Sequence, residues 1–227
     1  MIFNGIEKDY LTVLRGRKRP VITKIEHEMA RGRIRRTKLE ALEVIVPVLI
    51  EVPKGFVLEE IKEDFSGWLF HYEDKRLMFK DNPNRYYMAR LEEIDLDDHD
   101  RYADGDIKFI CQNPYRFGKN KELNITTDFN SFTITGQTAT SWTSETMFSA
   151  DRDKYELEIG NSKILLNFKF VEGDKLLIDF DKRSVKLRER DIAVAVSLQT
   201  DWTELSPGPV SIRASEPTTI YYDERYY

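Results

Sequence analysis

Apolar residues gather in short runs along the first half of the chain. The most apolar run is Leu39–Val52, and its β-branched residues indicate a strand. Pro47 lies in the middle of this run and has no N–H to donate, so we expect an edge position, a β-bulge or a split into two strands. Further strands are predicted at Met1–Asn4, Leu11–Leu14, Val21–Met29, Arg76–Phe79, Arg85–Ile94 and Ile107–Cys111.

One helix is predicted, from about Val57 to His71. Apolar side chains recur there at three- and four-residue spacing, and they would form one stripe: Leu58, Ile61, Phe65, Trp68 or Leu69, and Tyr72. Gly67 interrupts the pattern, and since glycine weakens a helix by roughly 1 kcal/mol relative to alanine, we expect close packing at this position. One helix on a strand-rich sheet predicts an α+β domain.

The pattern changes at Cys111–Gly118, which reads CQNPYRFG. Asn113–Pro114 ends the preceding apolar run, and Thr, Ser and Asn become frequent after Gly118. We therefore predict two domains, residues 1–118 and 119–227, in a mainly β protein. Short apolar runs without a helical period predict that the second domain is a β-sandwich. Its predicted strands are Leu123–Thr126, Phe132–Thr135, Tyr155–Ile159, Ile164–Phe170, Leu176–Phe180, Ser184–Leu187, Ile192–Val196, Val210–Ala214 and Ile220–Tyr222.

Composition indicates a folded protein with a charge-rich surface. Of the 227 residues, 41% are hydrophobic and 33% are charged, and no run approaches the ~18 apolar residues of a membrane span. The N-terminus lacks the pattern of a secretory signal, so we expect synthesis inside the cell and no membrane insertion. Cys111 is the only cysteine and lies in an apolar strand pattern, which predicts a buried, inert thiol.

Charge is segregated along the chain, although the net charge is only −5. Two basic clusters, Arg15–Arg19 and Arg31–Lys38, precede an acidic cluster, Glu92–Asp100. The segment Ala30–Arg36 contains Gly32 and suits an exposed hairpin tip or a mobile loop. Such segregation is compatible with complementary faces between copies of one subunit and equally with solvated loops.

No catalytic, cofactor or metal motif is present. His27, His71 and His99 lie far apart, and consecutive acidic residues around His99 would point in different directions. The sequence contains no nucleophile motif, phosphate-binding loop or paired-cysteine metal motif, so we expect neither an enzyme nor a bound cofactor.

Two binding alternatives stay open. The arginine clusters could bind nucleic acid, although the net negative charge of the chain argues against this. The second domain could be a carbohydrate-binding adhesin module that stacks sugars on Trp142, Trp202, Tyr221 and Tyr222.

Several segments resemble the distal tail proteins of siphophages. In the first half these are Tyr10–Pro20 (YLTVLRGRKRP), GWLF at the end of the helix, Arg76–Leu91 (RLMFKDNPNRYYMARL) and CQNPYRFG. In the second half they are ILLNFKF with GDKLLIDF, Trp202–Ser215 (WTELSPGPVSIRAS) and the terminal YYDERYY. The resemblance runs through nearly the whole chain in the family's order. The segment at Ala30–Leu39 departs from it, because it carries arginines where a Gly/Pro-containing loop is expected.

The resemblance implies a structural virion protein at the tail tip of a phage or prophage, assembled in the host cytoplasm. It implies a homo-hexameric ring built by residues 1–118, which joins the tail tube to the tip, and an outward galectin-like β-sandwich that docks receptor-binding or baseplate proteins. Direct, sequence-specific binding of nucleic acid is not expected. Candidate contacts between subunits, or with the lumen, come from the charged clusters: Arg15, Arg17, Lys18, Arg19, Arg31, Arg33, Arg35, Arg36, Glu92, Glu93, Asp95, Asp97 and Asp98.

Overall fold

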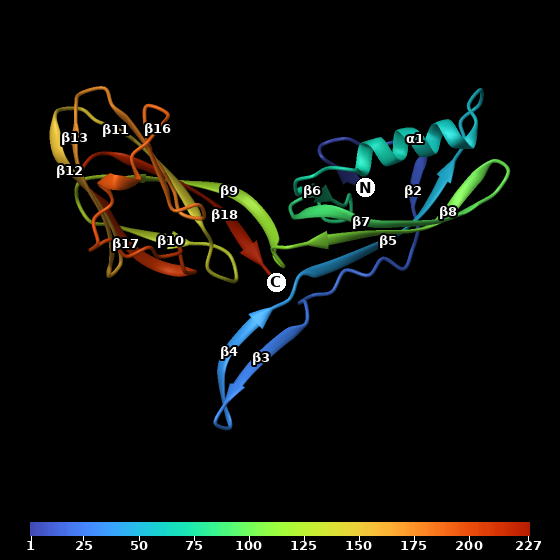
Figure 1. Cartoon of the computed structure of the whole chain (residues 1–227), viewed down its shortest axis with the longest axis horizontal. Coiled ribbons are helices and arrows are strands. Elements are labelled where there is room, and N and C mark those ends of the chain that lie inside the picture. Colours follow the sequence, from blue (N-terminus) through green and yellow to red (C-terminus); the bar gives the residue numbers. More distant parts are fainter. The chain divides into compact units, whose positions relative to one another are not determined.

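A computed structural model describes all residues, Met1–Tyr227, and the chain forms two compact units (Figure 1). The N-terminal unit comprises residues 1–117 together with Tyr227, and the C-terminal unit comprises Gly118–Tyr226. The predicted fold class is confirmed, because the chain is mainly β with one α-helix. That helix is too short and too polar to cross a membrane.

The N-terminal unit consists of eight strands and the helix, followed by the start of a ninth strand. In chain order they are β1 (Ile2–Phe3), β2 (Leu11–Val13), β3 (Ile25–Ala30), β4 (Arg33–Leu39), β5 (Leu42–Glu51), α1 (Leu58–Leu69), β6 (Lys75–Met78), β7 (Tyr86–Asp98), β8 (Tyr102–Cys111) and β9 (Arg116–Ile125). The strands β7, β8, β5 and β2 are neighbours in one antiparallel sheet, β6 joins β1 to β7, and β3 pairs with β4.

The core of this unit lies between one face of the sheet and α1. Alternate residues of β5 point to this face, since side chains alternate along a strand, and α1 adds its apolar stripe. The core side chains from these two elements and from β8 are Leu42, Val44, Val46, Val48, Ile50, Ile61, Phe65, Trp68, Leu69, Ile107, Phe109 and Cys111. The buried position that we predicted for the Cys111 thiol is confirmed.

The helix was predicted at the right place, with two errors of detail. It begins at Leu58, and the Glu60 carboxylate accepts a hydrogen bond from the Val57 N–H, which satisfies one of the free donors at the helix start. Tyr72 is 85% exposed and does not belong to the buried stripe. The expected close packing at Gly67 was wrong, because no atom lies within 4 Å of the position that a Cβ would take.

Pro47 does not interrupt β5, so the expected edge, bulge or split was wrong. The strand is continuous, and each of its residues from Leu42 to Glu51 has a partner in β8. On the other side, the Pro47 carbonyl accepts a hydrogen bond from the Leu14 N–H, one residue past the end of β2. The N–H and C=O of one residue point to the same side in an antiparallel ladder. The N–H that Pro47 lacks would therefore also point toward the chain just past the end of β2, and not toward β8. The ladder between β5 and β8 therefore loses no bond.

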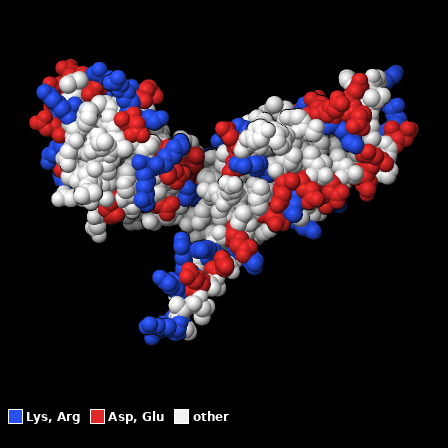
Figure 2. Space-filling view, in the orientation of Figure 1, with Lys and Arg blue, Asp and Glu red and all other residues white.

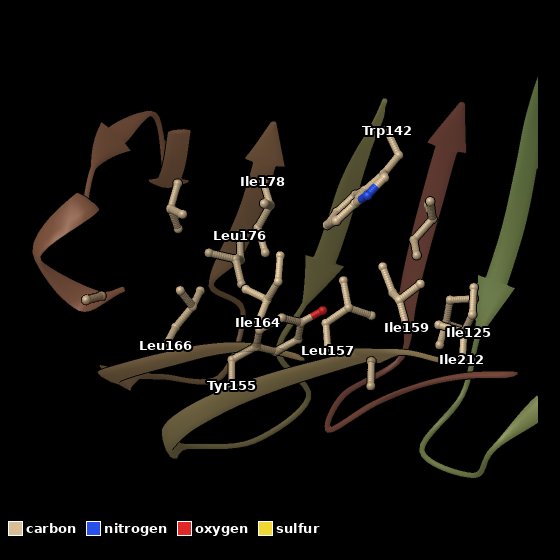
Figure 3. Close-up of a cluster of buried hydrophobic side chains, with 14 of the residues drawn as sticks. Ile125, Trp142, Tyr155, Leu157, Ile159, Ile164, Leu166, Leu176, Ile178 and Ile212 are labelled. Carbon is tan, nitrogen blue, oxygen red and sulfur yellow. The ribbon is translucent and has the colours of Figure 1, made fainter. Parts of the chain in front are cut away.

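The C-terminal unit is a sandwich of two antiparallel sheets. Besides most of β9, its elements are β10 (Asn130–Ile134), β11 (Trp142–Met147), β12 (Arg152–Ile159), β13 (Ser162–Phe170), β14 (Lys175–Asp179), β15 (Ser184–Leu187), β16 (Arg190–Asp191), the 3-10 turn η1 (Ala193–Ala195), β17 (Gly208–Ala214) and β18 (Thr218–Tyr226). One sheet has the order β16-β15-β14-β11-β18-β9, and the other has the order β10-β17-β12-β13. The buried side chains of both sheets meet between them (Figure 3).

Two strands of this unit were not predicted, and one predicted strand is absent. Trp142–Met147 forms β11 at the centre of the first sheet, and Arg190–Asp191 forms the short strand β16. The predicted strand Ile192–Val196 is instead a 3-10 turn, in which the Ala195 N–H donates to the Ile192 carbonyl. The side chain of Val194 in this turn is 94% exposed.

Candidate assembly surfaces

The hairpin of β3 and β4, residues 25–39, pairs with no other strand; we call it the β3–β4 arm (Figure 1). Its turn consists of Arg31 and Gly32, with φ angles of 50° and 73°. Positive φ at both central residues defines the type I′ turn that suits a two-residue hairpin. The expected hairpin tip at Ala30–Arg36 is thus reduced to two residues, and the rest of that segment is paired strand.

One face of the β3–β4 arm is apolar and open to solvent. Register places Ile25 opposite Leu39 and Met29 opposite Ile34, with His27 and Thr37 between the two pairs. A β-bulge opposite Glu28 and Met29 accommodates Arg35 as an extra residue, and this keeps Ile34 on the same face as Leu39. The side chains of Ile25, Met29 and Ile34 are 41%, 59% and 57% exposed.

The other face of the β3–β4 arm is charged. Glu26 lies opposite Lys38, Glu28 lies opposite Arg36, and Arg33 lies opposite Ala30. With Arg31 in the turn, basic side chains dominate the tip of the arm (Figure 2).

The base of the arm is held by polar contacts. The Thr23 hydroxyl donates to the Ala41 carbonyl at 2.9 Å, and Thr23 is buried. Next to it, the Lys24 ammonium lies 2.9 Å from the Glu40 carboxylate, and the Glu40 N–H donates to the Lys24 carbonyl. These bonds connect both strands of the arm at the point where it leaves the sheet.

The first basic cluster is mostly engaged within its own unit. Arg17 and Arg19 both pair with the Asp81 carboxylate, at 3.2 Å and 2.7 Å. Their guanidinium groups also lie over the Phe79 ring. Hydrogen bonding from Arg19 lowers the pKa of Asp81, so this carboxylate stays charged at neutral pH. Lys18 forms an isolated backbone bridge with Ile45, while the side chain of Arg15 is exposed.

The acidic cluster lies on β7, in its hairpin with β8. Asp95 lies opposite Asp106 and Asp97 lies opposite Asp104. Like charges at directly opposite positions destabilise a sheet, which makes this surface favourable for a basic partner. Of the other acidic candidates, Asp98 lies 2.8 Å from the Lys62 ammonium, Glu92 lies 3.6 Å from that of Lys108, and Glu93 is exposed. The acidic side chains appear in red along this part of the N-terminal unit (Figure 2).

The aromatic residues considered for sugar stacking are mostly unavailable. Trp142 is 2% exposed and donates its indole N–H to the Thr203 carbonyl, and Tyr222 is 3% exposed. Trp202 is half-buried with its ring edge-on to Phe180. Tyr221 lines two open grooves, with volumes of about 360 Å³ and 240 Å³, and the buried Trp142 and Tyr222 also border the smaller one. No group of three or more His, Cys, Asp or Glu side chains is placed to hold a metal ion.

Sequence reasoning located the charged clusters but missed the apolar face of the β3–β4 arm. The signal was present in Ile25 and Met29, which alternate with Glu26 and Glu28. The second strand did not show the same pattern. Its β-bulge changes the spacing between the apolar residues, so that they no longer recur at every second position.

Two family models match the chain, one in each unit. The phage tail protein RIFT-related domain matches residues 33–111, and the siphovirus-type tail component, C-terminal domain, matches residues 135–226. The distal tail protein of Bacillus phage SPP1 is 29% identical over 171 residues, which cover 72% of this chain and 68% of that protein. The chain belongs to the siphophage distal tail proteins.

Two solved structures of phage proteins share this fold. The crystal structure of the SPP1 distal tail protein, described as a paradigm of the hub adsorption apparatus of phages that infect Gram-positive bacteria, matches with a TM-score of 0.86 at 23% identity. That match covers 100% of this distal tail protein and 98% of the SPP1 chain. A chain of the phage P2 baseplate in its activated conformation with Ca matches with a TM-score of 0.58 at 8% identity, covering 95% and 91% of the two chains. This distal tail protein is therefore a component of the virion tail.

Proposed function

We propose that this distal tail protein forms a homo-hexameric ring through its N-terminal unit and connects the tail tube to the tail tip. The observation that carries the proposal is the apolar face of the β3–β4 arm, which no other part of its own unit covers. Its paired strands and fixed base present Ile25, Met29 and Ile34 together to solvent. Several exposed apolar side chains on one face of an ordered element are typical of an interface with another protein chain.

A ring explains why the covering partner is another copy of the chain. In a cyclic assembly, one patch of each subunit contacts a different patch of the next, and six such contacts close without leaving an open end. The apolar face of each arm is buried against the next subunit. Burial of apolar area supplies the main stabilisation of such contacts.

Charge complementarity supports the same arrangement. The basic residues of the arm, Arg31, Arg33, Arg35 and Arg36, face the acidic residues of the next subunit. These are Glu92, Glu93, Asp95, Asp97 and Asp98. Such pairing steers association and fixes the register of the contact. The first basic cluster serves a different role, because Arg17 and Arg19 already share Asp81; its exposed Arg15 and Lys18 face the lumen or the adjoining tube ring.

The mass of the assembly tests the ring. Native mass spectrometry of the full chain should show a species of about six times the 26.8 kDa monomer mass, and negative-stain images should show a central hole. The double variant Met29→Ser, Ile34→Ser should shift the population to monomer. A matched control is Val194→Ser, Leu198→Ser, which removes two exposed apolar side chains from the C-terminal unit and should leave the hexamer intact. A wild-type chain that stays monomeric at high concentration would argue against the ring.

Charge reversal tests the pairing separately. The variant Asp95→Lys, Asp97→Lys should dissociate the hexamer at low salt, and adding Arg33→Glu, Arg35→Glu should restore it. If the mass of the assembly is unchanged in the first variant, the proposed charge pairing is wrong. The proposed apolar contact is not affected by that result.

The C-terminal unit is proposed to dock a receptor-binding or baseplate protein. Val194 and Leu198 support this role, because they are 94% and 106% exposed on a loop that is bonded to β13, where the Ser197 N–H donates to the Leu165 carbonyl. The same double variant, Val194→Ser, Leu198→Ser, should lose binding to the purified tail-tip proteins of the same phage while its mass stays hexameric. Full retention of binding would remove this loop from the proposed docking surface.

A carbohydrate-binding adhesin module is the second candidate. The groove of about 360 Å³ beside Tyr221 favours it, since this is the place where an aromatic ring lies next to polar side chains such as Asp179 and Glu145. A glycan array with the full chain tests this candidate. Binding that disappears in Tyr221→Ala would establish it, and the absence of any bound glycan would reject it.

A further inference from the structure

Two open grooves adjoin on the first sheet of the C-terminal unit. Their volumes are about 360 Å³ and 240 Å³. The residues that line both grooves are Thr143, Asp179, Lys182 and Tyr221. The residues next to three of these along their strands, Trp142, Ile178 and Tyr222, belong to the core between the two sheets. Side chains alternate along a strand, so the shared groove residues of the strands point away from that core.

The register of the sheet explains why the grooves form there. Thr143 of β11 lies opposite Tyr221 of β18 on one side and opposite Asp179 of β14 on the other. In the next row, Glu145 lies opposite Leu177. The small side chain of Thr143 therefore leaves room between the larger side chains of its neighbours.

The larger groove has apolar walls and no unpaired carboxylate. The Tyr221 ring and the Leu177 side chain line it, and both are half-buried. The carboxylates of Glu145 and Asp179 each pair with a lysine, at 2.8 Å and 2.9 Å. This groove therefore suits an apolar side chain better than a charged one.

The smaller groove is acidic. Two carboxylates line it in addition to that of Asp179, namely those of Asp181 and Asp223. Each accepts a hydrogen bond from a neutral side chain, Asp181 from the Ser141 hydroxyl at 3.0 Å and Asp223 from the Asn120 amide at 3.2 Å. Neither carboxylate forms an ion pair with a side chain of the protein, so both can pair with a cation from outside.

The guanidinium behind the smaller groove is already engaged. Arg225 donates to the Ser141 hydroxyl at 2.7 Å, and its other terminal nitrogen lies 3.1 Å from the Glu204 carboxylate. Arg225 is 6% exposed and does not line the groove. Its charge is therefore directed at Glu204 and not at the two carboxylates of the groove.

We propose that the two grooves together bind an extended segment of a neighbouring tail protein, which carries an apolar side chain and, close to it, a lysine or arginine. The apolar side chain occupies the larger groove, and the cation lies beside Asp181 and Asp223, where charge complementarity fixes its position. An arginine in this place can also stack on the Tyr221 ring, which borders both grooves.

The spacing of the sheet fits such a segment. Outward rows of side chains are about 7 Å apart along a strand, which equals two residues of extended chain, so neighbouring side chains on one face of the segment reach from one groove to the other. A neutral sugar would leave both carboxylates without a cation. The inference rests on the proposed docking role of the C-terminal unit and adds the chemistry of the docked partner.

Binding of the full chain to the purified tail-tip proteins of the same phage tests the site. The variant Asp181→Asn, Asp223→Asn removes both charges with little change of shape and should weaken binding by about tenfold or more. Tyr221→Ala should weaken it as well. The matched control Asp128→Asn, Asp153→Asn changes two exposed aspartates of the same unit and should keep wild-type affinity. Circular dichroism and native mass spectrometry verify that each variant folds and assembles like the wild type.

The salt dependence of binding gives a second readout. The affinity of the wild type should fall as the salt concentration rises, and that of the variant Asp181→Asn, Asp223→Asn should fall less steeply, because two charge pairs are missing from it. A salt dependence that is equal in both proteins would contradict the inference.

The outcomes separate this inference from the docking role on which it rests. Unchanged affinity of the variant Asp181→Asn, Asp223→Asn overturns the inference, while the docking role stands. If no tail-tip protein binds the wild type, the docking role is wrong and the inference is overturned with it. Glycan binding that is lost in Tyr221→Ala but kept in Asp181→Asn, Asp223→Asn assigns the grooves to a sugar and also overturns the inference.

Discussion

The indole N–H of Trp68 donates a hydrogen bond to the backbone carbonyl of Phe3, 3.1 Å away, and so connects the helix to the first strand of the chain. The two rings also pack edge to face, with centroids 6.3 Å apart. Phe3 is fully buried and Trp68 is 6% exposed. This contact fixes β1 beneath the C-terminal end of α1, although the two residues are far apart in sequence.

Replacing Trp68 with phenylalanine should destabilise the N-terminal unit by about 2 kcal/mol. The change removes the indole hydrogen bond and part of a buried ring, while the Phe3 carbonyl keeps the bond from the Ile6 N–H. Urea denaturation followed by circular dichroism measures the free energy of unfolding. Tyr72→Phe serves as the control at an 85% exposed aromatic position and should change the stability by less than about 0.5 kcal/mol. Equal effects of the two variants would contradict the role of the Trp68 contact.

Gly67→Ala should stabilise the protein by about 1 kcal/mol. Gly67 is inside α1, its added methyl group would meet no atom within 4 Å, and alanine loses less backbone entropy on folding. Gly105→Ala is the contrasting variant. Its φ of 155° and the overlap of a Cβ with the Asp95 carbonyl oxygen predict a loss of about 2 kcal/mol or more. Thermal unfolding of both variants should therefore move in opposite directions, and a lower midpoint for Gly67→Ala would show that the helix needs glycine there.

The fold was predictable from the sequence where buried positions are apolar. Helix α1 and the strand β5 have clear apolar periods, and both were found. Strand β11 was missed because Ser144 and Thr146 point into the core beside Trp142, so that hydroxyl groups occupy positions that a periodicity analysis reads as solvent-facing. The burial of Thr146 is compensated by hydrogen bonds with the hydroxyl groups of Thr218 and Tyr155, whereas the Ser144 hydroxyl is buried without a hydrogen-bond partner.

The candidate surfaces were predictable only in part, for a similar reason. The charged clusters are visible in the sequence. The sequence does not show which of their side chains pair within the same chain and which are exposed to solvent. Arg19 is paired with Asp81 across 62 residues, and only the folded chain reveals that pair. The apolar face of the arm depends on a β-bulge, which has no distinct sequence signal beyond the irregular spacing of Ile34 and Leu39.

The thiol of Cys111 should not react with Ellman's reagent in the native protein. Cys111 is fully buried, and burial raises the pKa of its thiol to about 12, so the reactive thiolate is scarce at pH 8. Addition of urea should release one reactive thiol per chain, since the sequence contains one cysteine. The variant Met29→Cys provides the control, because this position in the β3–β4 arm is 59% exposed and should react without denaturant. Rapid labelling of the wild type would mean that β8 opens readily.

The variant Tyr155→Phe should lose less stability than the wild type as the pH rises above 10. The Tyr155 hydroxyl lies 2.8 Å from that of Thr218 and 3.2 Å from that of Thr146 inside the C-terminal unit. Burial raises the pKa of Tyr155 to about 12, whereas an unfolded tyrosine titrates near 10. The unfolded state therefore loses its proton first as the pH rises, and the wild type loses about 1.4 kcal/mol of stability per pH unit from this residue between pH 10 and 12.

At neutral pH the same variant should be less stable than the wild type by about 1 kcal/mol, because the Tyr155 hydrogen bonds are lost while Thr146 and Thr218 stay bonded to each other at 2.8 Å. Above pH 10 the wild type declines more steeply, so the difference between the two proteins shrinks and then reverses. Urea denaturation at pH 7, 10 and 11 measures this difference directly. Curves that stay parallel from pH 7 to 11 would show that the Tyr155 hydroxyl is not held protonated by the fold.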